Sequence, residues 1–369
     1  MNGFDLSTVT NIYLGSTPVK EVYIGTKLIW PAKADDYSNE YFTIESLEDG
    51  NQIGIVDSNR PSISISTDKQ TWTTVTPNAA PTYFITLNTG EKVYIKGSND
   101  KYYDDTWSTQ GYFTSTSKFN VSGNIMSLLY ADDFQNKTTL QSSCVFRQLF
   151  LNANKLVSAE HLVLPATTLV YRCYSEMFSG CSSLTTAPEL PATTLADYCY
   201  EGIFENCSSL TKAPELPATK LADYCYQYMF YGCSSLTKAP ELPAPPSSLY
   251  CYRGMFKDCT SLTKAPELPY ASLLATGCYN SMFWGCTSLT KAPKLPAYTL
   301  STYCYSSMFY NCTSLNDIIM LAIDISATDC LTGWVTNVAS SGTFIKDAST
   351  TLPTGDNGIP DGWTVYTVH

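Results

Sequence analysis

Charged residues are scarce in this chain. Asp, Glu, Lys and Arg make up 15% of its 369 residues, against about a quarter in an average globular protein. Acidic residues outnumber basic ones by 33 to 22, which gives a formal net charge of −11. Nucleic acids and anionic membranes attract proteins through basic patches, so we expect neither as a partner. The chain also lacks an apolar run of the roughly 18 residues that a membrane-spanning helix needs.

Residues and motifs that carry catalysis are equally scarce. The chain has two histidines, His161 and His369, and neither lies beside a nucleophile motif. There is no G-x-S-x-G, no P-loop, no H-E-x-x-H and no dinucleotide-binding glycine set. The glutamates recur in register along a repeat, and do not form the isolated acid pair that a glycosidase uses. We therefore expect no enzymatic activity, no cofactor and no metal ion.

The first residues lack the features of a secretory signal. Met1–Ser7 contain neither a basic segment nor an apolar one, and a signal peptide needs both. We expect assembly in the cytoplasm, with a trimmed leader as the alternative.

What the chain has in abundance is a repeat. One series of cysteines advances in steps of 26, 26, 26, 27, 26 and 26 residues, and a second series lies eight residues behind it. A fixed period of this length is typical of proteins that stack one unit on the next. The first series is Cys173, Cys199, Cys225, Cys251, Cys278, Cys304 and Cys330. The second is Cys181, Cys207, Cys233, Cys259, Cys286 and Cys312.

Each unit divides into two halves. In the half Cys199–Cys207, apolar residues lie at spacings of 0, 4, 5 and 8, which predicts a short helix with one apolar stripe. The half Leu210–Pro217 is predicted to be a short strand, because Pro214 disfavours helix at the residue before it. A single unit offers too few inward side chains to fold alone, so the units must stack.

The fourteen cysteines are predicted to be buried free thiols. Two cysteines eight residues apart would lie about 12 Å apart along a helix, which is too far for a disulfide. Equivalent cysteines of successive units would point the same way in parallel columns. A C-x7-C spacing is also not one that binds zinc.

The unit pattern combines Leu-Pro-x-x-x-Leu, Cys-Tyr-x-x-Met-Phe-x-x-Cys and Leu-x-x-Ala-Pro, and it extends from Cys144 to about Cys330. It resembles the BspA-type (Treponema-type) leucine-rich repeats, which occur in surface proteins of gut Bacteroides-like bacteria and in proteins of their phages. The resemblance implies an α+β fold, a solenoid whose 26-residue units each contain a short strand and a short helix. Here Cys-Tyr-x-x-Met-Phe replaces the Ala-Phe pair of the shorter, commoner form.

The N-terminal residues contain a shorter motif that occurs twice. Ile12–Thr17 reads Ile-Tyr-Leu-Gly-Ser-Thr and Val22–Thr26 reads Val-Tyr-Ile-Gly-Thr, which predicts two tight hairpins around Gly15 and Gly25. The motif resembles the short N-terminal modules of phage tail and fibre proteins, and this implies a docking role. A generic hairpin that caps the next domain is the alternative.

Short alternating segments follow, separated by turn residues, and they predict an antiparallel β-sandwich. They are Tyr41–Leu47, Gln52–Val56, Ser62–Ser66, Gln70–Thr76, Thr82–Leu87, Lys92–Lys96 and Tyr112–Phe119. Beyond the repeats, Cys330–Val338 is predicted to be a final helix with Trp334 over the open core, and residues 342–346 and 362–368 to be paired strands. We thus divide the chain into a hairpin docking module (1–33), a β-sandwich (34–122), a capped repeat solenoid (123–330) and a C-terminal cap (331–369).

Recurring side chains suggest surfaces. Lysines at 212, 238, 264 and 291 and glutamates at 189, 215, 241 and 267 are interpreted as a solvated face, with binding as the alternative. Recurring aromatic residues could pack in the wall of the array or contact a glycan or protein. As the candidate recognition surface we take Tyr200, Tyr226, Tyr228, Tyr231, Tyr252, Tyr279, Trp284, Tyr305 and Tyr310.

These observations favour a non-enzymatic phage virion protein, tail-associated or fibre-like, whose array binds a host cell-surface glycan or protein. The N-terminal module would contact other virion proteins, and a homo-oligomer such as a trimer would add avidity. Two alternatives stay open, namely a purely structural virion component and a bacterial cell-surface adhesin.

Overall fold

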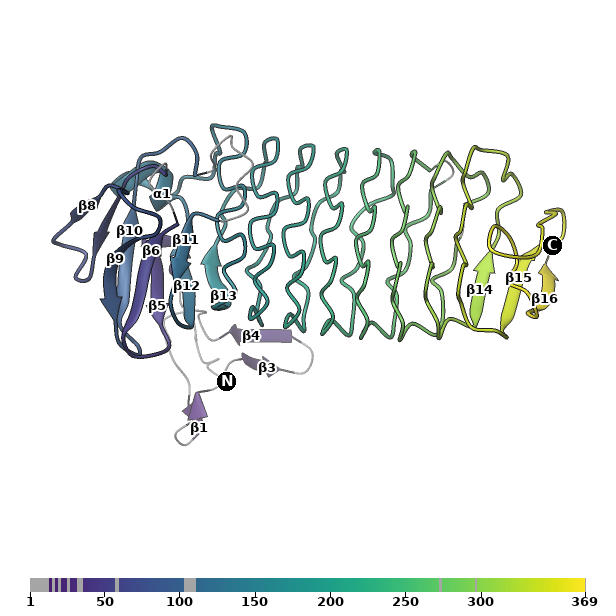
Figure 1. Cartoon of the computed structure of the whole chain (residues 1–369), viewed down its shortest axis with the longest axis horizontal. Coiled ribbons are helices and arrows are strands. Elements are labelled where there is room, and N and C mark those ends of the chain that lie inside the picture. Colours follow the sequence, from purple (N-terminus) through teal and green to yellow (C-terminus); the bar gives the residue numbers. More distant parts are fainter. Residues whose placement is uncertain are drawn as a thin grey trace, which may run out of the picture.

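The computed structural model describes residues 36–56, 60–102, 111–271, 274–295 and 297–368, together with the backbone of four strands between residues 13 and 31. This part of the chain is β-rich and repetitive (Figure 1). Its α-helix is limited to the four residues of α1 (Ser127–Tyr130), with 3-10 turns at η1 (Tyr37–Asn39) and η2 (Ala131–Asp133).

The four N-terminal strands form two hairpins, as predicted. β1 (Tyr13–Leu14) pairs antiparallel with β2 (Thr17–Pro18), and β3 (Glu21–Ile24) pairs antiparallel with β4 (Lys27–Pro31). The other residues of the predicted docking module lie outside the described residues.

Two sheets follow the hairpins, and every strand segment predicted between Tyr41 and Phe119 contains a strand. One sheet has six strands in the order β13-β12-β5-β10-β7-β8, and the other has three in the order β11-β6-β9. All pairs are antiparallel except β12 with β13. The strands are β5 (Phe42–Ser46), β6 (Asn51–Ile55), β7 (Ile63–Ser66), β8 (Thr73–Val75), β9 (Thr82–Leu87), β10 (Lys92–Lys96), β11 (Phe113–Ser115), β12 (Phe119–Asn124) and β13 (Leu156–Val163).

The six-stranded sheet continues into the repeats. β13 belongs to the first repeat unit, and it pairs in parallel with β12. The predicted boundary between residues 122 and 123 therefore falls inside β12.

The predicted helix of each unit is wrong. The segment from the first to the second cysteine of a unit, which we call the turn arm, is a run of overlapping four-residue turns. In the unit of Cys225, the amides of Gln227, Met229 and Tyr231 each donate to the carbonyl three residues back. Left-handed backbone recurs every fourth residue, at Tyr224 (φ 58°), Tyr228 (φ 55°) and Gly232 (φ 72°). An α-helix contains no such residues.

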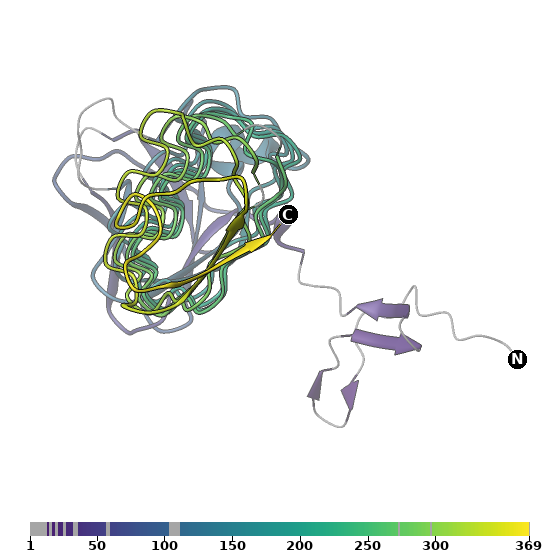
Figure 2. The same cartoon turned by 90° about the vertical axis from the view of Figure 1, so that its right-hand side faces the viewer.

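The intervening amides of the turn arm join one unit to the next. Tyr226, Tyr228 and Phe230 donate to carbonyls of the following unit over 2.8–3.0 Å. The same alternation recurs along the array, so half of the amides close turns and half form a ladder between units. The successive units therefore superimpose when the array is viewed end-on (Figure 2).

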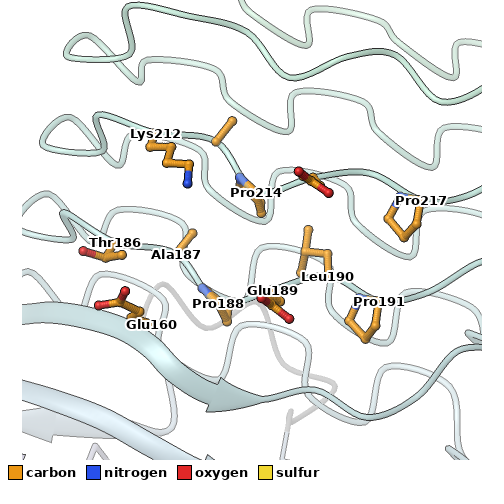
Figure 3. A pocket seen from close by; sticks show the side chains of 12 residues that line it. Glu160, Thr186, Ala187, Pro188, Glu189, Leu190, Pro191, Lys212, Pro214 and Pro217 are labelled. Carbon is orange, nitrogen blue, oxygen red and sulfur yellow. The ribbon is translucent and has the colours of Figure 1, made fainter. Parts of the chain in front are cut away.

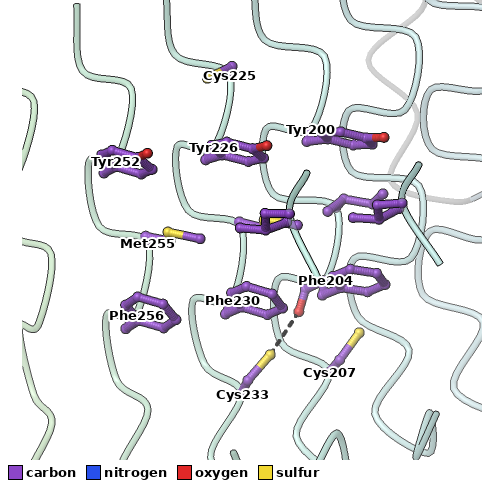
Figure 4. Packing of buried hydrophobic residues seen from close by; sticks show 14 of the residues in the cluster. Tyr200, Phe204, Cys207, Cys225, Tyr226, Phe230, Cys233, Tyr252, Met255 and Phe256 are labelled. Carbon is purple, nitrogen blue, oxygen red and sulfur yellow. Dashed lines mark hydrogen bonds between the residues drawn. The ribbon is translucent and has the colours of Figure 1, made fainter. Parts of the chain in front are cut away.

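The interior consists of columns of identical side chains (Figure 4). The phenylalanines of successive units stack with centroids 5.3–5.8 Å apart, and the tyrosines that follow the first cysteine stack at 5.8–6.1 Å. All fourteen cysteines are free thiols, as predicted. The second cysteine also has a role that the sequence did not suggest. Its thiol donates to a phenylalanine carbonyl of the preceding unit, as Cys233 does to Phe204 over 3.1 Å.

Both ends of this interior are covered. Phe42 and Phe113 of the two sheets lie against Phe150 of the first unit, with centroids 6.0 and 5.8 Å away. At the other end, Trp334 is fully buried against Phe309, and its Nε1 donates to Gly358. This confirms the covering role predicted for Trp334.

The C-terminal end contains strands and turns. β14 (Asp317–Met320), β15 (Thr343–Asp347) and β16 (Thr364–Val368) form a parallel sheet, so the predicted strand pair is confirmed. The predicted helix Cys330–Val338 is wrong, because the segment is a further run of turns with left-handed Gly333 (φ 61°) and Asn337 (φ 58°).

Candidate recognition surface

Five of the nine candidates, all of them tyrosines, are buried and cannot contact a partner. Tyr200, Tyr226, Tyr252, Tyr279 and Tyr305 are at most 1% exposed. In a helix the residue after the first cysteine would also lie toward the core, because it is about 100° from that cysteine and the apolar stripe at spacings of 0, 4, 5 and 8 spans about 0–140°. In the turn arm, adjacent residues point inward in pairs, so this tyrosine lies beside the cysteine in the core. These five tyrosines therefore pack in the wall of the array, which was the alternative to a contact surface (Figure 4).

The other four candidates, Tyr228, Tyr231, Trp284 and Tyr310, lie partly exposed on the outside of the turn arms. Three of them share one position, six residues after the first cysteine of the unit. We call this position in successive units the outer column, and it consists of Glu205, Tyr231, Lys257, Trp284 and Tyr310.

The outer column is a continuous stack from Tyr231 to Tyr310. The ammonium group of Lys257 lies 5.2 Å from the ring centroid of Tyr231 and 4.6 Å from that of Trp284. The rings of Trp284 and Tyr310 lie 4.3 Å apart at an angle of 31°. Cation–π and aromatic contacts of this kind contribute roughly 0.5–1.5 kcal/mol each. Neighbouring side chains thus cover ring faces of Tyr231, Trp284 and Tyr310, which stay partly exposed.

A second aromatic column runs parallel to the outer column, at the residue before the first cysteine. Tyr198 and Tyr224 stack with centroids 4.5 Å apart, and Tyr224 and Tyr250 at 5.3 Å. Arg172 lies 4.4 Å over the Tyr198 ring, and Arg253 lies 5.4 Å from Tyr250. These tyrosines are not among the nine candidates. Their regular recurrence before the first cysteine of each unit is the signal in the sequence that could have identified this second column.

Partly buried carboxylates lie at the N-terminal end of the outer column. Burial, followed by repulsion from Glu176 and Glu201, raises the pKa of Glu205 to about 7. Burial also raises the pKa of Glu201, against the attraction of Arg172, whose guanidinium lies 3.6 Å away. The outer column thus changes along the array from acidic to cationic and aromatic.

The opposite halves of the units form a second surface. We call the segment from Lys212 to Pro217, and its equivalents, the proline strand after the conformation predicted for it, although an isolated bridge at Lys212 is the one strand-like pairing described within Lys212–Pro217. Pro214 and Pro217 have no amide hydrogen, so the hydrogen-bond ladder between units is interrupted there. Cavities of 380, 570 and 480 Å³ lie between successive proline strands. Figure 3 shows one of them, with Lys212 and Pro214 of one unit next to Thr186 and Pro188 of the preceding one.

The described residues contain neither a cluster of potential metal ligands nor a long apolar helix. Within these ranges, no group of three or more His, Cys, Asp or Glu side chains is placed to hold a metal ion. No helix found there is long and apolar enough to cross a bilayer.

Comparison with known sequence families identifies the repeats. Residues 150–270 and 244–326 match the BspA type leucine-rich repeat region, in six copies. The chain is a BspA-like leucine-rich-repeat protein. No curated protein and no solved structure matches it.

Proposed function

We propose that this BspA-like protein is a non-enzymatic component of a phage virion, tail-associated or fibre-like, whose repeat array binds a glycan or protein on the host surface. In this proposal the array is a solenoid, the two preceding sheets are a sandwich that serves as a spacer, and the N-terminal hairpins contact other virion proteins. Several copies act together in a homo-oligomer, so that weak sites sum by avidity.

One observation carries the proposal, namely a variable surface on a constant interior. The core columns repeat Cys, Tyr, Met or Ile, Phe and Cys in each unit from Cys173 to Cys312, whereas the outer column reads Glu, Tyr, Lys, Trp and Tyr, with Ser179 at the same position of the preceding unit. Neighbouring units fix the backbone beneath this column through the amide ladder. Rigid tyrosine and tryptophan side chains offer large contact areas at a small entropic cost.

The arrangement of charges also supports recognition of a polar partner. Lys257 and Arg253 lie among aromatic side chains in the middle of the surface, while Glu201 and Glu205 lie at one end. Hydroxyl groups, an indole N–H and two cations side by side can bind the hydroxyl and carboxylate groups of a glycan, or a polar loop of a surface protein.

The test is adsorption of the labelled full chain, alone and multimerised on streptavidin, to a panel of gut anaerobes and to capsular glycans stripped from them. We expect saturable binding to some members of the panel, with competition by unlabelled chain. If the multimer binds no cell or glycan and instead assembles stoichiometrically with other virion proteins, the receptor-binding proposal is wrong and the purely structural alternative holds. A leader or lipid-attachment sequence encoded upstream of Met1 would instead favour the cell-surface adhesin.

A further inference from the structure

The proline strands carry two columns of opposite charge. One column consists of Lys212, Lys238 and Lys264, and the other of Glu215, Glu241 and Glu267, all of them exposed. Like charges are neighbours within each column, as in the direct pairing of Lys238 with Lys264. Like charges opposite one another on adjacent strands are destabilising.

The described part of the chain does not neutralise these six charges. None of the six side chains has an oppositely charged group within 4.0 Å, whereas Lys291 of the next unit binds Asp317 at 2.8 Å. The lysine and the glutamate of one strand are three residues apart, which is about 10 Å in extended backbone. No such pair forms within a unit among the described residues, so both columns present uncompensated charge on one face.

We infer that this face is an interface between two copies of the chain, related by a twofold axis parallel to the array. Such an axis exchanges the left and right sides of the face and keeps the position along the array. The lysine column of one copy then faces the glutamate column of the other at every unit, in both directions. A twofold axis across the array would instead place lysine against lysine. The charge pattern therefore selects the parallel arrangement.

The size of the face sets the strength of this association. Six residues of extended backbone span about 20 Å, and the five units from Thr186 to Lys294, of which the middle three carry both charges, span about 24 Å at the strand spacing. The contact then buries roughly 500 Å² per copy, or roughly 1,000 Å² in total, which is the lower limit for a specific interface. We expect a reversible dimer that weakens as salt screens the exposed charges. The charge pattern ends at Lys294, which stands where the next glutamate would be.

Exchange of charge between the columns tests this arrangement. The first variant of the full chain carries Lys212→Glu, Lys238→Glu and Lys264→Glu, and the second carries Glu215→Lys, Glu241→Lys and Glu267→Lys. A control with the same net charge as the first variant carries Lys118→Glu, Lys155→Glu and Lys220→Glu, at exposed positions away from the lysine column. Circular dichroism establishes that each variant is folded, and sedimentation velocity over a concentration series gives each dissociation constant.

The expected results follow if the two charged columns lie in the interface between two copies. Each column variant alone should dimerise at least about tenfold more weakly than the unchanged chain, and the control should dimerise normally. An equimolar mixture of the two variants should form a heterodimer, because an acidic face then meets a basic one. Three results would overturn the inference: an unchanged chain that stays monomeric at all concentrations, a control that dissociates as the variants do, or two column variants that do not bind each other.

Discussion

The hydroxyl groups of the buried tyrosine column provide a matched pair of substitutions. Tyr252 and Tyr279 occupy the same position in neighbouring units, are at most 1% exposed, and stack with centroids 5.8 Å apart. The Tyr252 hydroxyl donates to the carbonyl of Ala244 over 2.8 Å. The Tyr279 hydroxyl has no hydrogen-bond partner among the described residues. The same change to phenylalanine therefore removes a satisfied hydroxyl in one unit and an unsatisfied one in the next.

The two substitutions should change stability in opposite directions. Tyr252→Phe removes a buried hydrogen bond and should lower the free energy of unfolding by about 1 kcal/mol. Tyr279→Phe removes a buried polar group without a partner and should raise it by about 1 kcal/mol. Both variants keep the aromatic ring, so the stacking and the core volume are unchanged.

Equilibrium urea unfolding, followed by tryptophan fluorescence, measures this difference. Because a repeat array can unfold in parts, the midpoints of the two variants are compared with that of the unchanged chain under identical conditions. Tyr305→Phe, at another unpartnered hydroxyl, serves as a replicate of Tyr279→Phe. If Tyr279→Phe destabilises the protein as much as Tyr252→Phe does, the reasoning about unpartnered hydroxyls is refuted.

Three further predictions concern the turn arms, the thiols and pH. Gly333→Ala should lower the free energy of unfolding by about 1 kcal/mol in urea, because Gly333 has a left-handed φ of 61°. Steric clash does not contribute, since no atom lies closer than 3.6 Å to the added Cβ. If the segment were a helix, the same change would raise the free energy of unfolding by about as much. Thiol titration of the native chain should detect at most Cys144, the one cysteine of the fourteen that is not buried, and titration in denaturant should detect all fourteen; fewer thiols in denaturant would reveal disulfides. Glu205 has a folded-state pKa raised from its usual 4.5 to about 7, so the folded state holds its proton more tightly than the unfolded state. The stability of the unchanged chain relative to Glu205→Gln should therefore be highest below pH 4.5 and fall as the pH rises to 7, and a difference that does not vary with pH would contradict this assignment.

The sequence was sufficient for the repeat, the strands of the two N-terminal sheets and the free thiols, but not for the conformation of the turn arm. The strand predicted at Leu210–Pro217 is also absent, because only an isolated bridge at Lys212 forms there. Apolar residues at spacings of 0, 4, 5 and 8 fit one face of a helix, and over so short a segment they fit a period of four equally well. The distinguishing signal was the series of glycine, asparagine and aspartate residues at every fourth position, such as Gly202 with Asn206 and Gly254 with Asp258. These residue types adopt left-handed backbone at the lowest cost.

The error in the candidate surface has a separate cause. In a helix, too, the residue after the first cysteine falls inside the apolar stripe. The choice of Tyr200 and its equivalents rested on the suitability of recurring tyrosines for a contact surface. In the turn arm this residue and the cysteine point inward together, and Tyr200 is 1% exposed. Residues three and six positions after the cysteine lie outside in either conformation, and for this reason Tyr228 and Trp284 were predicted correctly as surface residues.

The claim that the outer column recognises a receptor is tested most directly by two triple variants of the full chain in the adsorption assay. One variant carries Tyr231→Ser, Trp284→Ser and Tyr310→Ser. The control removes three exposed tyrosines elsewhere, through Tyr270→Ser, Tyr298→Ser and Tyr366→Ser. We predict that the outer-column variant stays folded but loses at least about tenfold in affinity for the cells that the unchanged chain binds, while the control binds normally. Equal binding by both variants would contradict the account and leave the outer column as packing alone.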